Sequence, residues 1–201
     1  ALEAVAKPTQ GSVELLFTYD EEFGGEVGPG WLLANKVIHP DLMVAVNLSA
    51  RQFQRGVVLK QVETALGESG IPPSKLELEL TESVLMHDGE LVTGALRQLK
   101  ALGVKLSIDD FGTGYSSLAY LRRFKCDKIK IDQSFVHDLI DDPDNAAIVR
   151  GIISLAQSLG LDVLAEGVEN VAVAQRLKHL RCTYAQGYYF SRPLRPELFL
   201  E

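Results

Sequence analysis

The chain has 201 residues, 46% of them hydrophobic and 23% charged, which suits one well-packed domain. A formal net charge of −7, with no basic stripe or aromatic-interleaved basic patch, argues against a surface for nucleic acid polymers. There is no signal peptide, no apolar run near the roughly 18 residues of a membrane span, and no disulfide framework from Cys126 and Cys182, so we expect a soluble cytoplasmic domain without membrane contact and with buried thiols.

Strands and helices are predicted to alternate from about Met43 onward. Six segments have strand patterns: Met43–Leu48, Leu76–Thr81, Val104–Asp109, Lys128–Asp132, Leu161–Glu166 and Cys182–Gly187. Five segments between them have helical patterns: Val57–Glu68, Glu90–Leu102, Leu118–Phe124, Asn145–Leu159 and Val171–Leu180. Helix boundaries are marked by Gly70, Gly103 and Gly160 at expected C-caps and by Asp142-Pro143 at a helix start. Repeated βα units of this length predict a parallel sheet, open or closed.

The predicted strands have one apolar and one polar face. In Leu76–Thr81 the leucines share one face and the glutamates the other, and Lys128–Asp132 separates its isoleucines from its charged residues in the same way. A strand covered by helices on both faces should be apolar throughout. One polar face favours a (β/α) barrel, whose charged lumen residues should gather at the C-terminal mouth.

The N-terminal segment is too short for its share of such a barrel. A barrel takes about 250 residues, and residues 1–42 would have to supply two strands and two helices. We treat residues 1–201 as one barrel domain and expect that about residues 1–42 lack loop residues of the complete domain. Consecutive Cα atoms much more than about 3.8 Å apart in this segment would identify such a gap.

Asp109 and Asp110 follow a predicted strand directly and precede the glycine-rich stretch Gly112-Thr113-Gly114. Two adjacent carboxylates repel each other unless a cation or a proton lies between them. At the carboxyl end of a barrel strand, this pair indicates a metal site. The alternative for an isolated Asp pair is an Asx-turn that caps the next helix.

The other strand ends add polar residues to the same mouth. The set is Asn47, Glu79, Asp109, Asp110, Lys130, Glu166 and Gln186, with Glu169 one turn after Glu166. Several ionised carboxylates beside one lysine need compensating charge, and oxygen ligands suit magnesium, manganese or calcium better than zinc. The four histidines all fall outside the strand ends.

A pair of such cations suits phosphodiester hydrolysis, because it can hold the phosphate, activate water and stabilise the leaving oxygen. Lys130 could position that water or neutralise developing charge, or it could be an exposed strand lysine. Glu166 could be a ligand or a general base. Asn47 could merely satisfy a turn. Spacing alone does not choose between these roles.

Several motifs in order between about Val44 and Pro193 resemble those of EAL-domain cyclic di-GMP phosphodiesterases. They are Val46–Phe53, Glu77–Ser83, Asp109–Leu118, Lys128–Asp132, Ala165–Glu169 and Ala185–Tyr188. The resemblance implies an α/β fold, a modified TIM-type (β/α)8 barrel with its first strand antiparallel. It also implies hydrolysis of cyclic di-GMP to linear pGpG with two divalent cations, magnesium or manganese.

The resemblance assigns a role to each matching position. Asn47, Glu79 and Asp109 match the ligands of one cation, and Asp109, Asp110 and Glu166 match those of the other. Lys130 matches a lysine that contacts the catalytic water, and Glu169 and Gln186 match residues that shape the substrate pocket. Glu82 matches a glutamate that anchors the glycine-rich loop after Asp110, a loop associated with dimerisation and regulation.

The signature motif itself departs from the family pattern. The best match is Gly11–Phe17, in which Glu14 would be a metal ligand and Leu15 replaces the family's alanine. Thr18 stands where the family has an arginine that contacts the substrate phosphate. If the chain is continuous here, the phosphate loses a partner.

Two function classes follow. The first is a metal-dependent phosphodiesterase acting on cyclic di-GMP, and the second is a catalytically inactive cyclic di-GMP receptor that signals through a partner. The filled positions from Asn47 to Gln186 favour the enzyme. The resemblance also implies a homodimer and attached sensory or cyclase domains.

Overall fold

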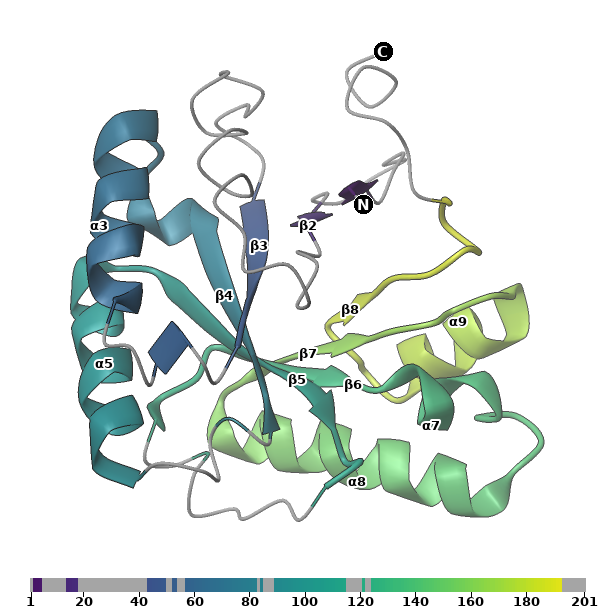
Figure 1. Ribbon diagram of the computed structural model, residues 1–201. Coiled ribbons are helices and arrows are strands. Elements are labelled where there is room, and N and C mark those ends of the chain that lie inside the picture. Colours follow the sequence, from purple (N-terminus) through teal and green to yellow (C-terminus); the bar gives the residue numbers. More distant parts are fainter. Residues whose placement is uncertain are drawn as a thin grey trace.

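The computed structural model describes residues 2–4, 14–17, 43–49, 52–53, 57–82, 84, 89–114, 121 and 124–192. One curled eight-stranded sheet has its strands in chain order (Figure 1). The strands are β1 (Leu2–Ala4), β2 (Glu14–Phe17), β3 (Met43–Leu48), β4 (Leu76–Thr81), β5 (Lys105–Phe111), β6 (Lys128–Ile131), β7 (Asp162–Ala165) and β8 (Tyr184–Ala185). β1 runs antiparallel to β2, and every later neighbouring pair is parallel. The antiparallel first strand implied by the resemblance is therefore present.

In the described part of the chain, helices lie between β3 and β4, between β4 and β5, between β6 and β7, and between β7 and β8. They are α3 (Val58–Ser69), the 3-10 turn η1 (Pro73–Lys75), α5 (Gly89–Leu102), α7 (Gln133–His137), α8 (Pro143–Leu159) and α9 (Val171–His179). Figure 1 shows α3 and α5 side by side on one flank, with α8 running along the outer face of β6 and β7. Within the described residues β1 and β8 remain the two edges of the sheet. The described architecture is thus TIM-barrel-like, and full closure stays a prediction.

Every predicted boundary that falls in the described residues agrees with the structure within two residues. The short helix α7 was not predicted, because the alternation of Lys128, Lys130 and Asp132 indicates a strand that extends to Asp132. Asp132 instead caps α7, since its carboxylate accepts a hydrogen bond from the Ser134 N–H at 2.9 Å. β5 continues two residues beyond Asp109, and β8 contains only Tyr184 and Ala185. The proposed gap within residues 1–42 and most of the predicted helix Leu118–Phe124 lie outside the described residues.

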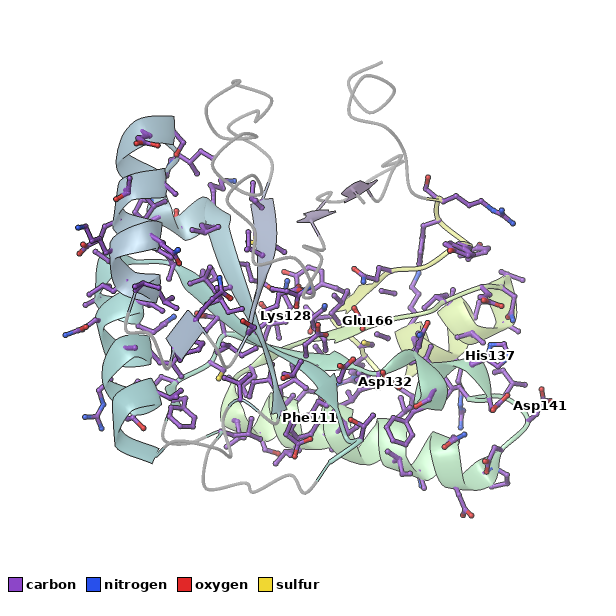
Figure 2. All side chains as sticks on the ribbon, in the orientation of Figure 1. Phe111, Lys128, Asp132, His137, Asp141 and Glu166 are labelled. Carbon is purple, nitrogen blue, oxygen red and sulfur yellow. The ribbon has the colours of Figure 1, made fainter. Side chains whose placement is uncertain are left out.

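The two faces of β6 show how the alternating pattern is used. Ile129 and Ile131 are fully buried in the apolar core that also includes Val149 and Ile153 of α8. Lys128 and Lys130 are also buried, on the opposite face of the strand. Figure 2 shows the labelled Lys128 on the side of the sheet away from α8. The charged face therefore lines the inside of the curled sheet, as the pattern predicted.

No helix in the described part of the chain is long and apolar enough to cross a membrane. Cys126 and Cys182 are both free, the first buried and the second partly buried. Burial raises the pKa of the Cys126 thiol to about 12, so this cysteine is an unreactive core residue.

Asp127 ties together the N-terminal ends of the strands, opposite the predicted metal site. Its carboxylate accepts hydrogen bonds from the Lys100 ammonium at 2.6 Å, the Leu106 N–H at 2.8 Å and the Lys105 ammonium at 3.3 Å. Burial by itself raises the pKa of Asp127, but the bonds from Lys100 and Leu106 outweigh it, so the pKa lies below its usual 3.8. This carboxylate therefore remains ionised at neutral pH and holds α5, β5 and β6 together.

We expect Asp127→Ala to lower the free energy of unfolding by about 2 kcal/mol, because a partly buried N–H and a lysine lose their acceptor. Because the folded-state pKa is depressed, this contribution is present above the usual pKa and is lost as pH falls below it. Urea unfolding of both proteins at neutral pH measures the difference. Asp141→Ala, which removes an exposed acid, is the control and should change stability by less than about 0.5 kcal/mol. An equal loss of stability in both variants would contradict the role of Asp127 in holding α5, β5 and β6 together.

Candidate metal centre

Lys130 lies at the centre of a ring of carboxylates on the inner face of the sheet. Its ammonium is 3.0 Å from Glu79 Oε2, 2.8 Å from Asp109 Oδ1 and 2.9 Å from Glu166 Oε1. Only 2% of the Lys130 side chain is exposed, so the alternative of an exposed strand lysine is wrong. The three acids come from β4, β5 and the end of β7. One ammonium therefore holds together residues that are far apart in the sequence.

One positive charge does not balance the acids around it. Lys130 stays protonated, because the attraction of Glu79, Glu166 and Asp109 outweighs its burial and raises its pKa. Burial is the largest effect at Glu79 and raises its pKa to about 8, despite the opposing charge of Lys130. The pKa of Glu166 is raised for the same reason. Without a metal, the Glu79 carboxyl group of this cluster therefore tends to hold a proton at neutral pH.

A β-bulge lets two consecutive aspartates contribute to one site. On a regular strand Asp109 and Asp110 would face opposite sides of the sheet. The pairing of β5 with β6 shifts between Ile108 and Phe111, and Asp110 has a left-handed backbone with φ of 51°. Oxygens of Asp109, Asp110 and Glu166 consequently lie within 4.8 Å of one another. The sequence predicted this pair as a metal site, but only the bulge explains how both carboxylates reach it.

The donor set fits hard divalent cations. Asp109, Asp110 and Glu166 offer only oxygen ligands, at a spacing that one cation can span. Asn47 of β3 is half-buried, and its Cα pairs with that of Glu79 on β4, so it lies beside the cluster. Burial, followed by the neighbouring Asp109, raises the pKa of Asp110 to about 6. A bound cation would relieve this crowding of negative charge.

Gln186 forms a hydrogen bond with Glu166, and each of these residues is followed by a glycine with a positive φ. The Gln186 side-chain amide donates to Glu166 Oε1 at 2.8 Å. A Cβ on Gly187 would lie 2.3 Å from the backbone of Val168, and a Cβ on Gly167 would lie 2.6 Å from Gln133 Cβ. Both positions therefore require glycine, and the close approach they permit places Gln186 against the carboxylate.

Glu82 is buried beside the glycine-rich loop. Both of its carboxylate oxygens lack a hydrogen-bond partner within the described residues. A Cβ on Gly114 would lie 3.2 Å from Glu82 Oε2, so the loop passes directly over this carboxylate. The contact agrees with an anchoring role, which stays a prediction.

Two other predicted residues lie apart from the cluster. Glu169 is exposed, and one carboxylate oxygen is 3.8 Å from Nδ1 of His137 on α7. Glu14 begins β2, and its Cα pairs with Met43, four residues before Asn47 on β3. This register places its backbone nearer the N-terminal end of the sheet, and its side chain lies outside the described residues. Its assignment as a ligand therefore depends on the resemblance alone.

The sequence reasoning missed one neighbour of the cluster, Asp132. The charge of Asp132 and a hydrogen bond between the two carboxyl groups contribute to the raised pKa of Asp110, after burial and Asp109. The alternation Lys128, Lys130, Asp132 could have identified it, because it puts these three residues on one face of the predicted strand.

Comparisons with known proteins agree with this geometry. Residues 32–193 match the EAL domain family. The bifunctional diguanylate cyclase/cyclic di-GMP phosphodiesterase MucR of Pseudomonas aeruginosa is 46% identical over 162 residues, which cover 81% of this chain and 24% of that protein. The chain thus spans about a quarter of the length of that relative.

Two solved structures show the same fold with ligands. The PaMucR phosphodiesterase in complex with c-di-GMP has a TM-score of 0.83 and 36% identity, over 98% of this chain and 93% of that chain. The manganese and cyclic di-GMP complex of BlrP1 from Klebsiella pneumoniae has a TM-score of 0.81 and 28% identity, over 96% of this chain and 55% of that chain. By its sequence, fold and acidic cluster, this chain belongs to the EAL domain family of cyclic di-GMP phosphodiesterases.

Proposed function

We propose that the chain is a metal-dependent phosphodiesterase that hydrolyses cyclic di-GMP to linear pGpG within a closed modified (β/α)8 barrel. The observation that carries this proposal is the Lys130 ammonium in contact with the carboxylates of Glu79, Asp109 and Glu166. Oxygens of Asp109, Asp110 and Glu166 also lie within 4.8 Å of one another, a spacing that one cation can span. The ligands of related structures, cyclic di-GMP with or without manganese, support the same chemistry.

Each residue of the cluster has a role in this proposal. Two sets of ligands would hold two magnesium or manganese ions. The first set is Asn47, Glu79 and Asp109, with Glu14 if its side chain reaches the site. The second set is Asp109, Asp110 and Glu166. When bound, the cations supply Lewis acidity that activates water and stabilises the phosphate charge.

Lys130 and Glu166 are the proposed catalytic residues. With cations held by these carboxylates, the Lys130 ammonium would be free to orient the attacking water or to stabilise developing negative charge. Gln186 orients Glu166 through their 2.8 Å hydrogen bond and, with Glu169, borders the substrate pocket.

Two proposals concern partners. The first is that Glu82, which lies under Gly114, anchors the glycine-rich loop. Through this loop, the contacts between the subunits of a homodimer would influence the position of Asp110. Because the chain spans 24% of MucR, we also propose that sensory or cyclase domains are attached outside this segment.

The decisive experiment is incubation of the chain with cyclic di-GMP and Mg²⁺ or Mn²⁺, with chromatography of the products. We expect linear pGpG, and we expect chelation of the metal to stop its formation. Glu166→Gln keeps the size of the side chain but removes its charge, so it should abolish turnover while the fold remains intact. Tight binding of cyclic di-GMP without any linear product would instead support the inactive receptor. Unaltered turnover by the variant would contradict the role of Glu166.

A further inference from the structure

A second buried ion pair lies below the metal centre. The Lys128 ammonium is 2.9 Å from Glu77 Oε2, and each side chain is less than 5% exposed. The same ammonium lies 5.2 Å from the centre of the Tyr184 ring, within range of a cation–π contact. Glu77, Lys128 and Tyr184, which we name the lower layer, come from the alternate strands β4, β6 and β8.

The metal centre repeats this arrangement two residues further along the same strands. Glu79 and Lys130 form the upper ion pair, and Gln186 follows β8. Residues two apart on a strand share a face and are separated by about 6.6 Å. Layers built from alternate strands are the packing mode of a barrel interior. The two ion pairs are therefore stacked, with the metal centre on top.

Ser107 of β5 makes room for both ion pairs. β5 lies between β4 and β6, and the Ser107 Cα pairs with Glu79 on one side and Lys128 on the other. Ser107 is fully buried, and its hydroxyl has no hydrogen-bond partner within the described residues. A larger side chain here would stand between the acids of β4 and the lysines of β6.

Fold stability alone does not account for the lower layer. A buried ion pair is often no better for stability than apolar residues of similar volume, because both charges lose their hydration. Its charges lie next to the metal centre, because Glu77 is two residues from Glu79 on β4 and Lys128 is two residues from Lys130 on β6.

Without Lys128, the carboxylate of Glu77 would have no cation of its own. Among the described residues, Lys130 lies on the same inner face, two residues along β6 from Lys128. Glu77 would then draw Lys130 downward, away from Asp109 and Glu166. We propose that Lys128, held by Glu77 and the Tyr184 ring, is a positioning residue that keeps Lys130 at the level of the metal centre.

The test measures Mn²⁺ binding by calorimetry, with no substrate present, and kcat for cyclic di-GMP. In Lys128→Met, we expect the Mn²⁺ dissociation constant to fall roughly tenfold, because Lys130 leaves the ligands and one positive charge is removed nearby. We expect kcat to fall at least about tenfold, because Lys130 no longer reaches the water. The double variant Glu77→Gln/Lys128→Met removes the competing carboxylate and should restore both values to within about threefold of the original.

In Lys128→Met the Mn²⁺ affinity should rise while kcat falls, and the double variant should reverse both changes. Structural damage to the site would instead lower both quantities. A fall in both Mn²⁺ affinity and kcat, or a double variant no better than Lys128→Met, would overturn the proposal. Lys100→Met, which breaks an ion pair at the other end of the strands, is the matched control and should leave both values unchanged.

Tyr184 provides a second route if Lys128→Met fails to fold. Tyr184 is partly exposed, so the protein should tolerate Tyr184→Leu. This variant should raise Mn²⁺ affinity and lower kcat, both by less than Lys128→Met does. Tyr184→Phe keeps the ring face that contacts Lys128 and should change neither quantity. Identical behaviour of these two variants would overturn the proposal. The kcat measurements depend on the proposed function, but the Mn²⁺ measurements do not. Turnover failing in the unsubstituted chain would therefore contradict the enzyme, and unchanged Mn²⁺ binding in Lys128→Met would contradict the positioning role.

Discussion

Lys130→Met is expected to lower kcat for cyclic di-GMP by about three orders of magnitude, the loss typical of removing one charged group that stabilises a transition state. Methionine keeps most of the apolar stem of lysine but removes the ammonium that lies within 3.0 Å of three carboxylates. Mn²⁺ should bind at least as tightly as before, because the ammonium and the cation compete for the same oxygens. Steady-state kinetics and calorimetry on the same preparation measure both quantities.

The metal-free variant should also be less stable, because Glu79, Asp109 and Glu166 then lack their shared cation. Saturating Mn²⁺ should recover most of this loss, because the metal binds only the folded site. Lys100→Met is again the control, since its Asp127 partner lies at the opposite end of the strands. A Lys130→Met protein that keeps more than a tenth of the original kcat would refute the catalytic role.

Mn²⁺ affinity is expected to rise steeply with pH. In the metal-free protein the pKa of Asp110 is raised to about 6 and that of Glu79 to about 8. A cation must displace the protons that these groups hold. We therefore expect the Mn²⁺ affinity of the site with Glu79 to rise about tenfold per pH unit up to about pH 8. The affinity of the site with Asp110 should rise about tenfold per pH unit up to about pH 6, and each affinity should change little above its own value. Calorimetry in buffers of different ionisation enthalpy counts the protons released.

The stability of the metal-free protein should depend on pH in the opposite direction. The folded-state pKa of Glu79 is raised above its usual 4.5, so its contribution is fully present below 4.5 and is lost as pH rises through about 8. The Tm of the metal-free protein should therefore fall over this range, while the increase in Tm on adding Mn²⁺ should grow. A Mn²⁺ affinity that stays constant through this range would contradict the protonated cluster.

The sequence determined the periodic features of this protein. The alternation of Leu76–Thr81 and of Lys128–Ile131 predicted one apolar and one charged face, because side chains on a strand alternate strictly. Gly70 and Gly160 have left-handed backbones and end their helices, as the sequence predicted from their positions after helical patterns. The strand-end residues Glu79, Asp109, Lys130 and Glu166 were recognisable as one set, because parallel strands end at one edge of a sheet.

Only the tertiary structure decided which charges meet and how. The β-bulge that turns both Asp109 and Asp110 into the site depends on the pairing of β5 with β6, and local sequence does not specify that pairing. The short helix that Asp132 caps was missed because a five-residue helix has too little periodicity to detect. Lys130 forms ion pairs with three acids, and Lys128 forms one with Glu77 below it. These ion pairs join strands that are dozens of residues apart in the sequence. Their geometry follows from the stagger of alternate strands around a curled sheet, which no single segment of the sequence contains.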